Sequence, residues 1–287
     1  MRPKSQKHWT DDASSLLRVG RGFRLDRVDA EATPGYGRRK KDSVDDLVSG
    51  ADELGELQER LYAASRVETT DAAVLLVLQA MDTAGKGGII RHVVGAVDPQ
   101  GVQLAAFKKP TDDELAHDFL WRVQERVPGP GMIGVFDRSH YEDVLIGKVR
   151  ELAPAEEIER RYGAINDFEK RLTDGGTRVI KVMLHISSDE QRDRLMERLD
   201  RPDKHWKYHP GDVDERMLWP AYMDAYQTVF DRTSTPHAPW YVVPANRKWY
   251  ARLAVQSLLL DALLDIAPRW PEATYDVEAE RKRLRAT

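Results

Sequence analysis

The stretch that decides the fold is AAVLLVLQAMDTAGKGG, residues 72–88, and the apolar segment IIRHVV follows it at residues 89–94. An apolar run without polar alternation is typical of a strand that is buried on both faces of a parallel sheet. The small residues after it favour a turn, and the second apolar segment has the character of a helix. Residues 72–94 therefore predict a buried strand, a loop and a helix, and the loop is the candidate binding element.

The loop has the composition of a phosphate-binding loop. Such a loop points backbone N–H groups at anionic oxygens, while a lysine reaches the outer phosphates. Gly85, Lys86, Gly87 and Gly88 stand where this architecture needs them. The match to G-x-x-x-x-G-K-[ST] is imperfect at both ends, because Ala80 replaces the first glycine and Gly87 replaces the hydroxyl residue that holds Mg²⁺. An ordinary glycine-rich turn into a helix stays open as the alternative.

Charged residues follow three of the predicted strands. Asp82 lies in the loop after the first strand, and it is the natural substitute for the missing hydroxyl because a carboxylate is a good ligand for Mg²⁺. Lys108-Lys109 follows a predicted strand at 102–107, and Asp137 follows one at 132–136. Ligands of open parallel sheets lie at the carboxyl ends of the strands. The sequence therefore predicts phosphates near the lysines and a second Mg²⁺-binding acid at Asp137.

Composition limits the class of protein. At 287 residues and 41% hydrophobic, the chain can bury one large α/β core. The absence of cysteine excludes disulfides and thiolate chemistry, which leaves oxygen- or histidine-bound metals. A net charge of −4 argues against a general nucleic-acid binder. No apolar run approaches 18 residues and no signal-peptide pattern occurs, so we expect a soluble, cytoplasmic protein that does not enter a membrane.

The order of elements predicts a three-layer α/β fold, in which helices cover both faces of a parallel sheet. Residues 1–42 are expected to form an arm over a surface, residues 43–270 the catalytic domain, and residues 271–287 a tail that straps the surface. Helices are expected at 43–67, 87–97, 111–127, 154–174, 214–233 and 246–266, and further strands at 178–186 and 240–243. The helix at 154–174 is expected to place Ile158, Tyr162, Ile165, Phe168 and Leu172 on one side. The helix at 214–233 is expected to break at Trp219-Pro220 and to place Trp219, Tyr222, Tyr226 and Phe230 in the core. In the helix at 111–127, the periodicity places Leu115, Phe119, Val123 and Val127 on the buried face and Arg122 off it.

Residues 187–215 interrupt the alternation of strands and helices with a segment rich in cations. Ser187 and Glu190 suggest a capping box at its start, and the cations that follow include Arg194, Arg198, Arg201, Lys204 and Lys207. Cations along one helical edge repel each other unless an anion lies among them, so the segment is interpreted as a lid that closes over phosphates. A solvated amphipathic helix, with its own carboxylates as partners, is the alternative.

Three motifs together resemble the polyphosphate kinase 2 family. They are D-x-A-G-K-G-G at residues 82–88, F-[DN]-R-S-x-Y at 136–141 and R-P-x-K-x-W-K at 201–207, and they occur in the family's order across most of residues 25–270. The continuation at 140–145 and the arm at 25–34 resemble the class III subgroup, which accepts nucleoside mono- and diphosphates. The resemblance implies a thymidylate-kinase-like P-loop fold, Mg²⁺ as cofactor, inorganic polyphosphate as a substrate, and a homodimer or homotetramer.

The resemblance also implies roles for individual residues. Metal binding falls to Asp82 and Asp137. Phosphate contacts fall to Lys86, Arg91, Lys108, Arg138, Arg194, Arg198, Lys204 and Lys207, and Lys109 and Arg122 could extend this basic track. Nucleotide contacts are expected from the turn after the third strand, which carries Asp137, Arg138, Ser139, Tyr141 and Glu142. Asp82, Lys86, Asp137, Arg138 and Arg194 form the expected catalytic set.

The expected reaction is the transfer of a phosphoryl group from polyphosphate to AMP or ADP. It needs in-line placement, charge neutralisation and exclusion of water, and no dedicated general base, because a nucleotide phosphate is already ionised. One alternative is an ATP-dependent nucleotide kinase, which would need an adenine pocket besides the acceptor site. The other is a non-catalytic P-loop module that binds nucleotide, and the row of lid arginines argues against it.

Overall fold

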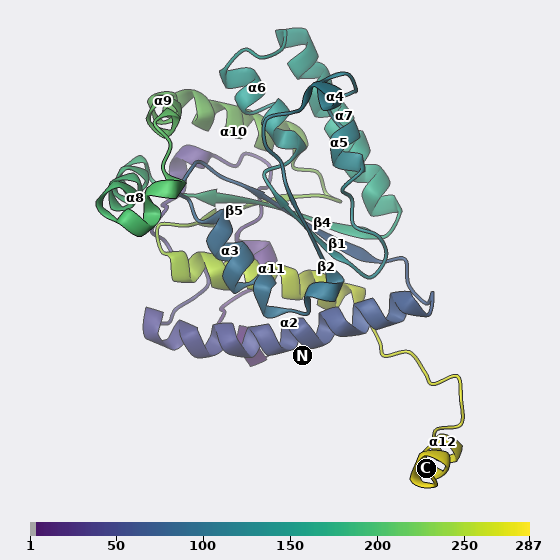
Figure 1. Cartoon of the computed structure of the whole chain (residues 1–287). Helices are drawn as coiled ribbons and strands as arrows, with labels where there is room; N and C mark the ends of the chain where they lie inside the picture. The colour runs from purple at the N-terminus through teal and green to yellow at the C-terminus, as the bar shows by residue number, and fades with distance from the viewer. Residues whose placement is uncertain (1–3) are drawn as a thin grey trace.

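The computed structural model describes residues 4–287, and its centre is a five-stranded sheet in which all neighbouring strands are parallel (Figure 1). The strand order is β2-β3-β1-β4-β5. The bounds are β1 Ala73–Gln79, β2 Val102–Ala106, β3 Ile133–Asp137, β4 Thr177–His185 and β5 Trp240–Pro244. This confirms the predicted parallel sheet.

The central strand β1 is buried on both faces because helices cover both. Val74, Leu76 and Leu78 pack into one apolar cluster, whereas Leu75 and Val77 pack into another. Successive side chains of a strand point to opposite faces, so an uninterrupted apolar run suits a strand with a core on each side.

The helices form the two outer layers of the sandwich. On one face lie α11 (Lys248–Ile266) and α3 (Lys86–His92), with α2 (Ser43–Arg66) packed outside α11 (Figure 1). On the other face lie α7 (Ala155–Asp174) and α10 (Trp219–Thr233). The expected three-layer arrangement is therefore confirmed.

The amino-terminal arm covers the β5 edge of the sheet. Its elements within the described residues are three short turns, Lys4–Gln6, Leu25–Arg27 and Lys40–Asp42, and α1 (Ala13–Leu16). The Val19 amide donates to the Trp240 carbonyl at 2.8 Å, and the Val242 amide donates to the Leu17 carbonyl at 3.0 Å. These bonds satisfy backbone groups that an open edge strand would expose. The arm therefore lies over a surface, as expected, and its hydrogen bonds to β5 join it to the sheet.

Two predicted helices are shorter than their periodicity indicated. The segment 111–127 contains only α4 (Asp112–Leu115) and α5 (Trp121–Gln124), and the expected buried residue Leu115 is 64% exposed. Arg122, expected off the buried face, is buried instead. The predicted continuous helix is wrong because polar contacts of Arg122, described below, hold this segment. The helix expected at 87–97 ends at His92 and continues as a short turn.

The lid segment contains α8 (Ser188–Asp200), a turn at Pro202–Lys207 and α9 (Gly211–Met217). Ser187 caps α8 by accepting a hydrogen bond from the Glu190 amide at 3.2 Å, while the Glu190 carboxylate pairs with Arg194 instead of completing the box. The predicted break near Trp219-Pro220 is confirmed, since α9 ends at Met217 and α10 begins at Trp219.

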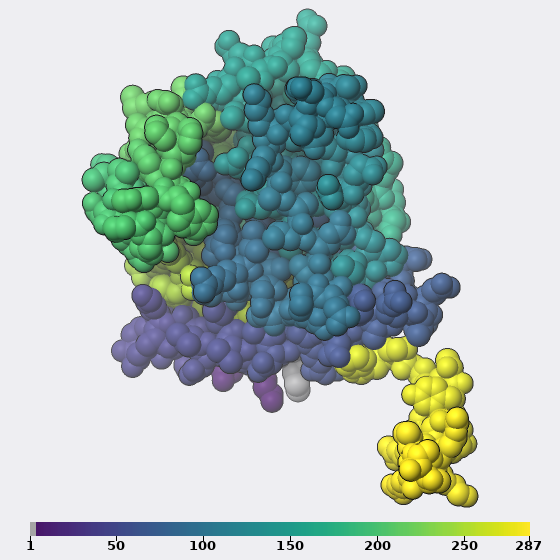
Figure 2. Space-filling model, viewed as in Figure 1, coloured from purple at the N-terminus to yellow at the C-terminus, as the bar shows by residue number. Residues whose placement is uncertain are grey.

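The carboxyl-terminal tail differs from the expected strap. It leaves the body near α2 and ends in α12 (Val277–Arg285), which Figure 1 and Figure 2 show standing away from the domain. The remaining short helix, α6 (Ile146–Val149), follows the turn after β3. Within residues 4–287, no helix has both the length and the apolar character to cross a membrane.

The stability of the folded protein should depend on pH because of His185, the last residue of β4. Burial lowers its pKa to about 4, against the weaker effect of a hydrogen bond with the Val28 backbone. The unfolded chain takes up a proton near pH 6.5, whereas the folded protein does not until about pH 4, so stability is full above pH 6.5 and falls as the pH drops towards 4. We expect a loss of about 2 kcal/mol by pH 5 and about 3 kcal/mol in total.

Urea unfolding of the wild type and of His185→Gln, at pH 7 and pH 5, measures this contribution. The variant should lose about 2 kcal/mol less between the two pH values, whatever its stability at pH 7. Equal losses in both proteins would contradict the assignment to His185.

Candidate active site

The loop between β1 and α3 has a strained backbone that its neighbours hold in place. Gly85 has a φ of 115° and Thr83 a φ of 68°, and the second value is unfavourable for a β-branched residue. Arg194 donates to the carbonyls of Thr83 and Ala84 at 3.0 and 3.2 Å. Gln191 donates to the Asp82 carbonyl at 3.2 Å. The first half of α8 is therefore fastened to the loop, which fixes the loop conformation.

Arg194 supports the backbone of the loop, and its side chain does not face the space above the loop. It is 5% exposed, and its remaining donors reach the carbonyls of Ala245 and Asn246 at 2.8 and 3.0 Å and the carboxylate of Glu190 at 2.6 Å. All of its hydrogen-bonding directions point at protein, so the structure does not bring it to the phosphate side as the sequence predicted. It positions the loop instead.

A cavity of about 720 Å³ opens over the loop, between the lid and the body of the domain. Figure 2 shows the hollow between the green lid atoms and the blue atoms of the body. Ten lysines and arginines line it against three carboxylates, those of Asp82, Asp137 and Glu197. Of the expected phosphate contacts, the cavity contains Gly85, Lys86, Gly87, Gly88, Arg91, Lys108, Arg138, Arg198, Lys204 and Lys207. Sequence reasoning did not assign Lys248, Arg252 and His92, which line it from α11 and α3.

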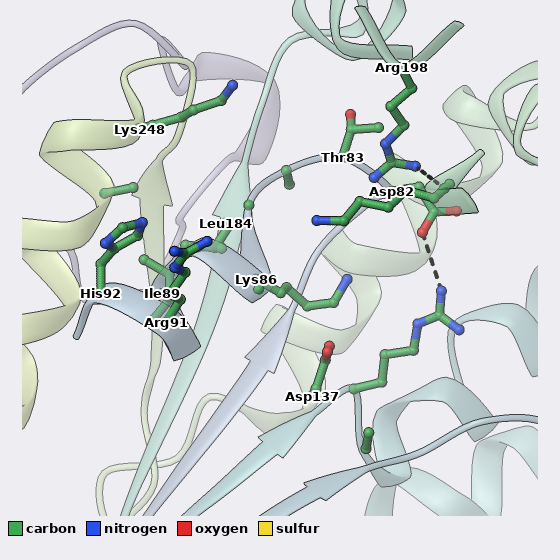
Figure 3. A pocket seen from close by; sticks show the side chains of 18 of the residues that line it. Asp82, Thr83, Lys86, Ile89, Arg91, His92, Asp137, Leu184, Arg198 and Lys248 are labelled. Atoms are coloured by element: carbon green, nitrogen blue, oxygen red, sulfur yellow. Dashed lines mark hydrogen bonds and ion pairs between the residues drawn. The ribbon is translucent and has the colours of Figure 1, made fainter. Parts of the chain in front are cut away.

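Charges of both signs meet at the centre of this cavity. Figure 3 shows that Lys86, Asp82 and Asp137 extend into the same space from the loop and from the end of β3. Arg138 follows β3 with a φ of 65° and donates to Asp82 at 3.2 Å. Burial acts against its charge, but Glu142, Asp82 and Asp137 together raise the pKa of Arg138. The guanidinium therefore stays charged, with carboxylates on several sides.

A second cavity, of about 340 Å³, lies on the other side of the Asp82–Arg138 pair. Its lining differs in chemistry from the first, because it is acidic and aromatic: Glu142, Asp212, Glu215, Tyr222 and Tyr226. The Tyr222 hydroxyl donates to Glu215 at 2.5 Å. Burial raises the pKa of Glu142 against the charge of Arg138, and burial followed by the charge of Asp82 raises the pKa of Asp212. Asp82 and Arg138 line both cavities.

Sequence reasoning identified only part of this second cavity. Glu142 was an expected nucleotide contact, but Asp212 and Glu215 were not assigned, and the two tyrosines were assigned to the core. Both tyrosines are buried, as expected, and also form the wall of the cavity. A signal was present in the sequence, since Asp212 and Glu215 follow the last lid cation, Lys207, after the short turn at 208–211.

Besides Arg194, four expected site residues lie away from both cavities. Arg122 is buried, donates to the Lys108 carbonyl at 2.9 Å and lies 3.5 Å from Asp143. Lys109 is exposed and does not contribute to either lining. Ser139 and Tyr141 are fully buried behind the turn. Ser139 accepts from Gln79 at 3.1 Å and caps the turn that begins at His140, so both residues support Arg138 from behind.

The residues of this site fit a magnesium ion that a phosphate helps to bind. In the part of the chain that the structure describes, no three histidines or acidic residues are grouped as a metal cage. Asp82 and Asp137 nevertheless line one cavity beside Lys86. Mg²⁺ is commonly bound by one or two carboxylates together with waters and substrate phosphates, and it does not require an all-protein cage.

The fold and the site together define a class of protein. A glycine-lysine loop lies at the carboxyl edge of a parallel sheet, a carboxylate follows a neighbouring strand, and a cationic lid faces both. This is the arrangement of P-loop proteins that transfer phosphoryl groups.

The chain belongs to the family described as polyphosphate kinase 2 (PPK2), whose model matches residues 39–269. It is 45% identical to the AMP/ADP-polyphosphate phosphotransferase of Meiothermus ruber over 87% of this chain and 92% of that protein. It is 40% identical to the ADP-polyphosphate phosphotransferase of Rhodopseudomonas palustris over 93% and 94%. The crystal structure of polyphosphate kinase 2 from Arthrobacter aurescens TC1 is similar, with a TM-score of 0.95, 58% identity, and coverage of 97% and 98%. The family expected from the sequence is confirmed.

Proposed function

We propose that this protein transfers a phosphoryl group from inorganic polyphosphate to AMP or ADP. The observation that supports the proposal is the pair of cavities that meet at Asp82 and Arg138. The larger cavity is rich in cations, as a polyanion requires, and the smaller one carries carboxylates and aromatic rings. Its carboxylates can accept hydrogen bonds from a nucleobase or a ribose, and its tyrosines can pack against the base. The two relatives that are named polyphosphate phosphotransferases support the same assignment.

In the proposed step, a terminal phosphate oxygen of the nucleotide attacks the end phosphorus of polyphosphate. A new P–O bond forms, the bond to the next phosphate of the chain breaks, and the bridging oxygen keeps the electron pair on the shortened chain. Lys86 and Arg138 offset the charge on the transferred group, and Arg198 and Lys207 cover it from the lid. No protein base takes part, because the attacking oxygen is already ionised.

Asp82 and Asp137 would hold the magnesium ion, which would neutralise charge on the phosphates when bound. Asp82 is also paired with Arg138 at 3.2 Å. That contact keeps the carboxylate oriented towards the junction of the two cavities. The homodimer or homotetramer expected from the resemblance stays a prediction, which analytical ultracentrifugation can test.

The decisive experiment incubates the protein with AMP or ADP, Mg²⁺ and long-chain polyphosphate, without ATP. We expect ADP and ATP to form while the polyphosphate shortens, and EDTA to stop the reaction. If AMP is phosphorylated only when ATP is supplied, the protein is an ATP-dependent nucleotide kinase. If nucleotide binds without turnover under either condition, the non-catalytic interpretation holds.

Asp137→Ala should lower kcat by at least about a hundredfold, because it removes one of the two carboxylates expected to hold the ion. The variant should require a higher Mg²⁺ concentration for half-maximal rate, and its thermal melt should stay close to that of the wild type. Asp174→Ala, at the exposed end of α7, is the matched control. An unchanged Mg²⁺ requirement in Asp137→Ala would exclude Asp137 as a metal ligand.

A further inference from the structure

One ion pair of the lid joins the two cavities. Arg198, on α8, lines the larger cavity, and Asp212, on α9, lines the smaller one. The pair is 3.3 Å apart, measured from Nη1 of the arginine to Oδ2 of the aspartate. Among the lid's ion pairs in residues 4–287, this is the one whose two partners line different cavities. The lid therefore contains a direct contact between the cation-rich and the acidic binding space.

This contact holds one end of the Arg198 guanidinium and leaves the rest of it available. Nη1 donates to the Lys207 carbonyl at 2.9 Å as well as to Asp212. In the part of the chain that the structure describes, Nε and Nη2 have no hydrogen-bond or ion-pair partner. Figure 3 shows the side chain extending from the lid towards the loop that carries Asp82. The free donors can bind phosphate oxygens, while Asp212 and the Lys207 carbonyl set the direction of the side chain.

Asp212 is held in place by the turn that begins α9. Its Oδ2 accepts a hydrogen bond from the His209 amide at 3.4 Å, and its own amide donates to the His209 carbonyl at 2.8 Å. The side chain is 15% exposed, so it is largely withdrawn from water. Burial, followed by the charge of Asp82, raises the pKa of the Asp212 carboxyl group. Because Asp82 lies where the two cavities meet, this effect of its charge places Asp212 near that junction.

One carboxylate oxygen of Asp212 is available to a ligand. Both contacts of the side chain within the lid use Oδ2, and among residues 4–287 no hydrogen bond or ion pair reaches Oδ1. A largely buried acceptor without a partner gains free energy when a donor binds it. A ribose supplies hydroxyl donors, and a nucleobase supplies amino donors. A nucleotide in the smaller cavity can therefore bind Oδ1 while Oδ2 stays on Arg198.

The two helices that carry the pair are joined at a second point. Arg216 on α9 donates to the side-chain oxygen of Gln191 on α8 at 3.1 Å. Gln191 in turn donates to the Asp82 carbonyl at 3.2 Å, which fastens this end of α8 to the loop. A ligand that holds α9 in place therefore also holds α8, and with it Arg198.

We propose that Asp212 is a positioning residue that links the acceptor nucleotide to Arg198. A nucleotide in the smaller cavity fixes Asp212, and Asp212 fixes Arg198 over the phosphoryl group that polyphosphate delivers. Each substrate therefore tightens the binding of the other by the same factor. An empty acceptor cavity leaves Arg198 less firmly placed, which limits transfer of the phosphoryl group to water. The proposal rests on the proposed function, because it assigns polyphosphate to the larger cavity and the nucleotide to the smaller one.

The first test measures binding without turnover in the full-length protein. Adenosine is the acceptor probe, because it lacks the phosphate oxygen that attacks, so Mg²⁺ and tripolyphosphate can be present without transfer. Calorimetry gives the Kd of tripolyphosphate with and without saturating adenosine. Asp212→Asn keeps an oxygen that can accept from the His209 amide but removes the charge beside Arg198. Asp193→Asn is the matched control, since Asp193 is an exposed acid of α8 that pairs with Arg192 and lines neither cavity.

We expect adenosine to lower the Kd of tripolyphosphate at least about fivefold in the wild type and in Asp193→Asn, and less than about twofold in Asp212→Asn. Without adenosine, the three proteins should differ in this Kd by less than about threefold. A circular dichroism melt of each protein checks that it is folded. The proposal is wrong if adenosine has no effect in the wild type, or if Asp212→Asn retains the full effect.

The second test asks whether Asp212 acts through Arg198. With AMP and polyphosphate, Asp212→Asn should lower kcat at least about tenfold, and Arg198→Met at least about a hundredfold. The double variant should be no slower than Arg198→Met alone, because no guanidinium is left to position. The KM for AMP should rise about fivefold with Asp212→Asn in both backgrounds. If Asp212 only braced the lid, the two losses in kcat would multiply, and that result would overturn the proposal.

Failure of the proposed function has a different signature. If the wild type shows the adenosine effect but never phosphorylates AMP or ADP, the link between the cavities stands and the activity does not. If AMP and ADP are phosphorylated but adenosine acts alike on the wild type and on Asp212→Asn, the activity stands and the link is rejected. If the wild type binds neither adenosine nor tripolyphosphate, both are rejected.

Discussion

Replacing Lys86 by methionine should lower kcat by about a thousandfold while the protein stays folded. Lys86 extends from the start of α3 into the cavity, between the carboxylates of Asp82 and Asp137. Among residues 4–287, the only hydrogen bond of the Lys86 ammonium is a long one, 3.5 Å to the Ala80 carbonyl, so the fold depends little on this group. The charge is therefore available for the phosphoryl group, and preorganised charge at a transition state is worth about 3–4 kcal/mol.

The measurement is steady-state turnover of AMP and ADP with polyphosphate, together with a thermal melt. Methionine keeps most of the length and apolar volume of lysine, so the melting temperature should change by no more than a few degrees. Lys170→Met on α7 removes a lysine that pairs with Asp174 at the surface, and it should keep full activity. If Lys86→Met keeps more than a tenth of the wild-type kcat, the loop does not perform the transfer.

Replacing Lys181 by methionine should lower the free energy of unfolding by about 3–5 kcal/mol. Lys181 is a fully buried residue of β4, and its ammonium lies 2.6 Å from Glu169 on α7. It also donates to the Tyr141 hydroxyl at 2.9 Å and to the Thr233 carbonyl at 2.7 Å. Removing the cation leaves the buried Glu169 carboxyl group without its lysine partner, and keeping or neutralising its charge in a site closed to water costs free energy.

Denaturant unfolding of Lys181→Met, Glu169→Gln and the double variant measures this pair. The double variant should be more stable than the sum of the single losses predicts, because it leaves no unpaired charge behind. Lys170→Met again provides a surface control. Strictly additive losses would show that the two charges do not depend on each other.

The same network links the core to the site. Tyr141 donates to Glu169 at 2.8 Å, and Tyr141 lies in the turn that follows Arg138. The motif residues Ser139 and Tyr141, expected to contact nucleotide, are instead the anchors of this turn. Their position explains how Arg138 can be held at a positive φ, since the surrounding bonds determine the backbone there.

The spacing of apolar residues predicted a helix correctly where that helix packs against the core by one face. It predicted wrongly where polar contacts determine the path of the chain. In α7, the predicted residues Ile158, Tyr162, Ile165 and Phe168 are buried, and the fifth, Leu172, is half-buried. The segment 111–127 has a similar apolar pattern, yet Arg122 enters the interior to reach the Lys108 carbonyl and Asp143. A buried guanidinium with partners on two other segments outweighs a local apolar stripe, and no local pattern reveals those partners.

The sequence by itself determined the parallel sheet, the glycine-lysine loop, the two aspartates at strand ends and the family, because each depends on residues close together in the chain. The strand order was decided only by the tertiary structure, and that order places β3 beside β1 and so brings Arg138 to Asp82. The tertiary structure also separated Arg194 from Arg198, one helical turn apart on α8. The first lies against the loop and is buried, and the second reaches the cavity, because distance from the core changes along the helix. Residues far apart in the sequence, such as Arg91 and Arg252, line one cavity only because the packing of α3 on α11 brings them together.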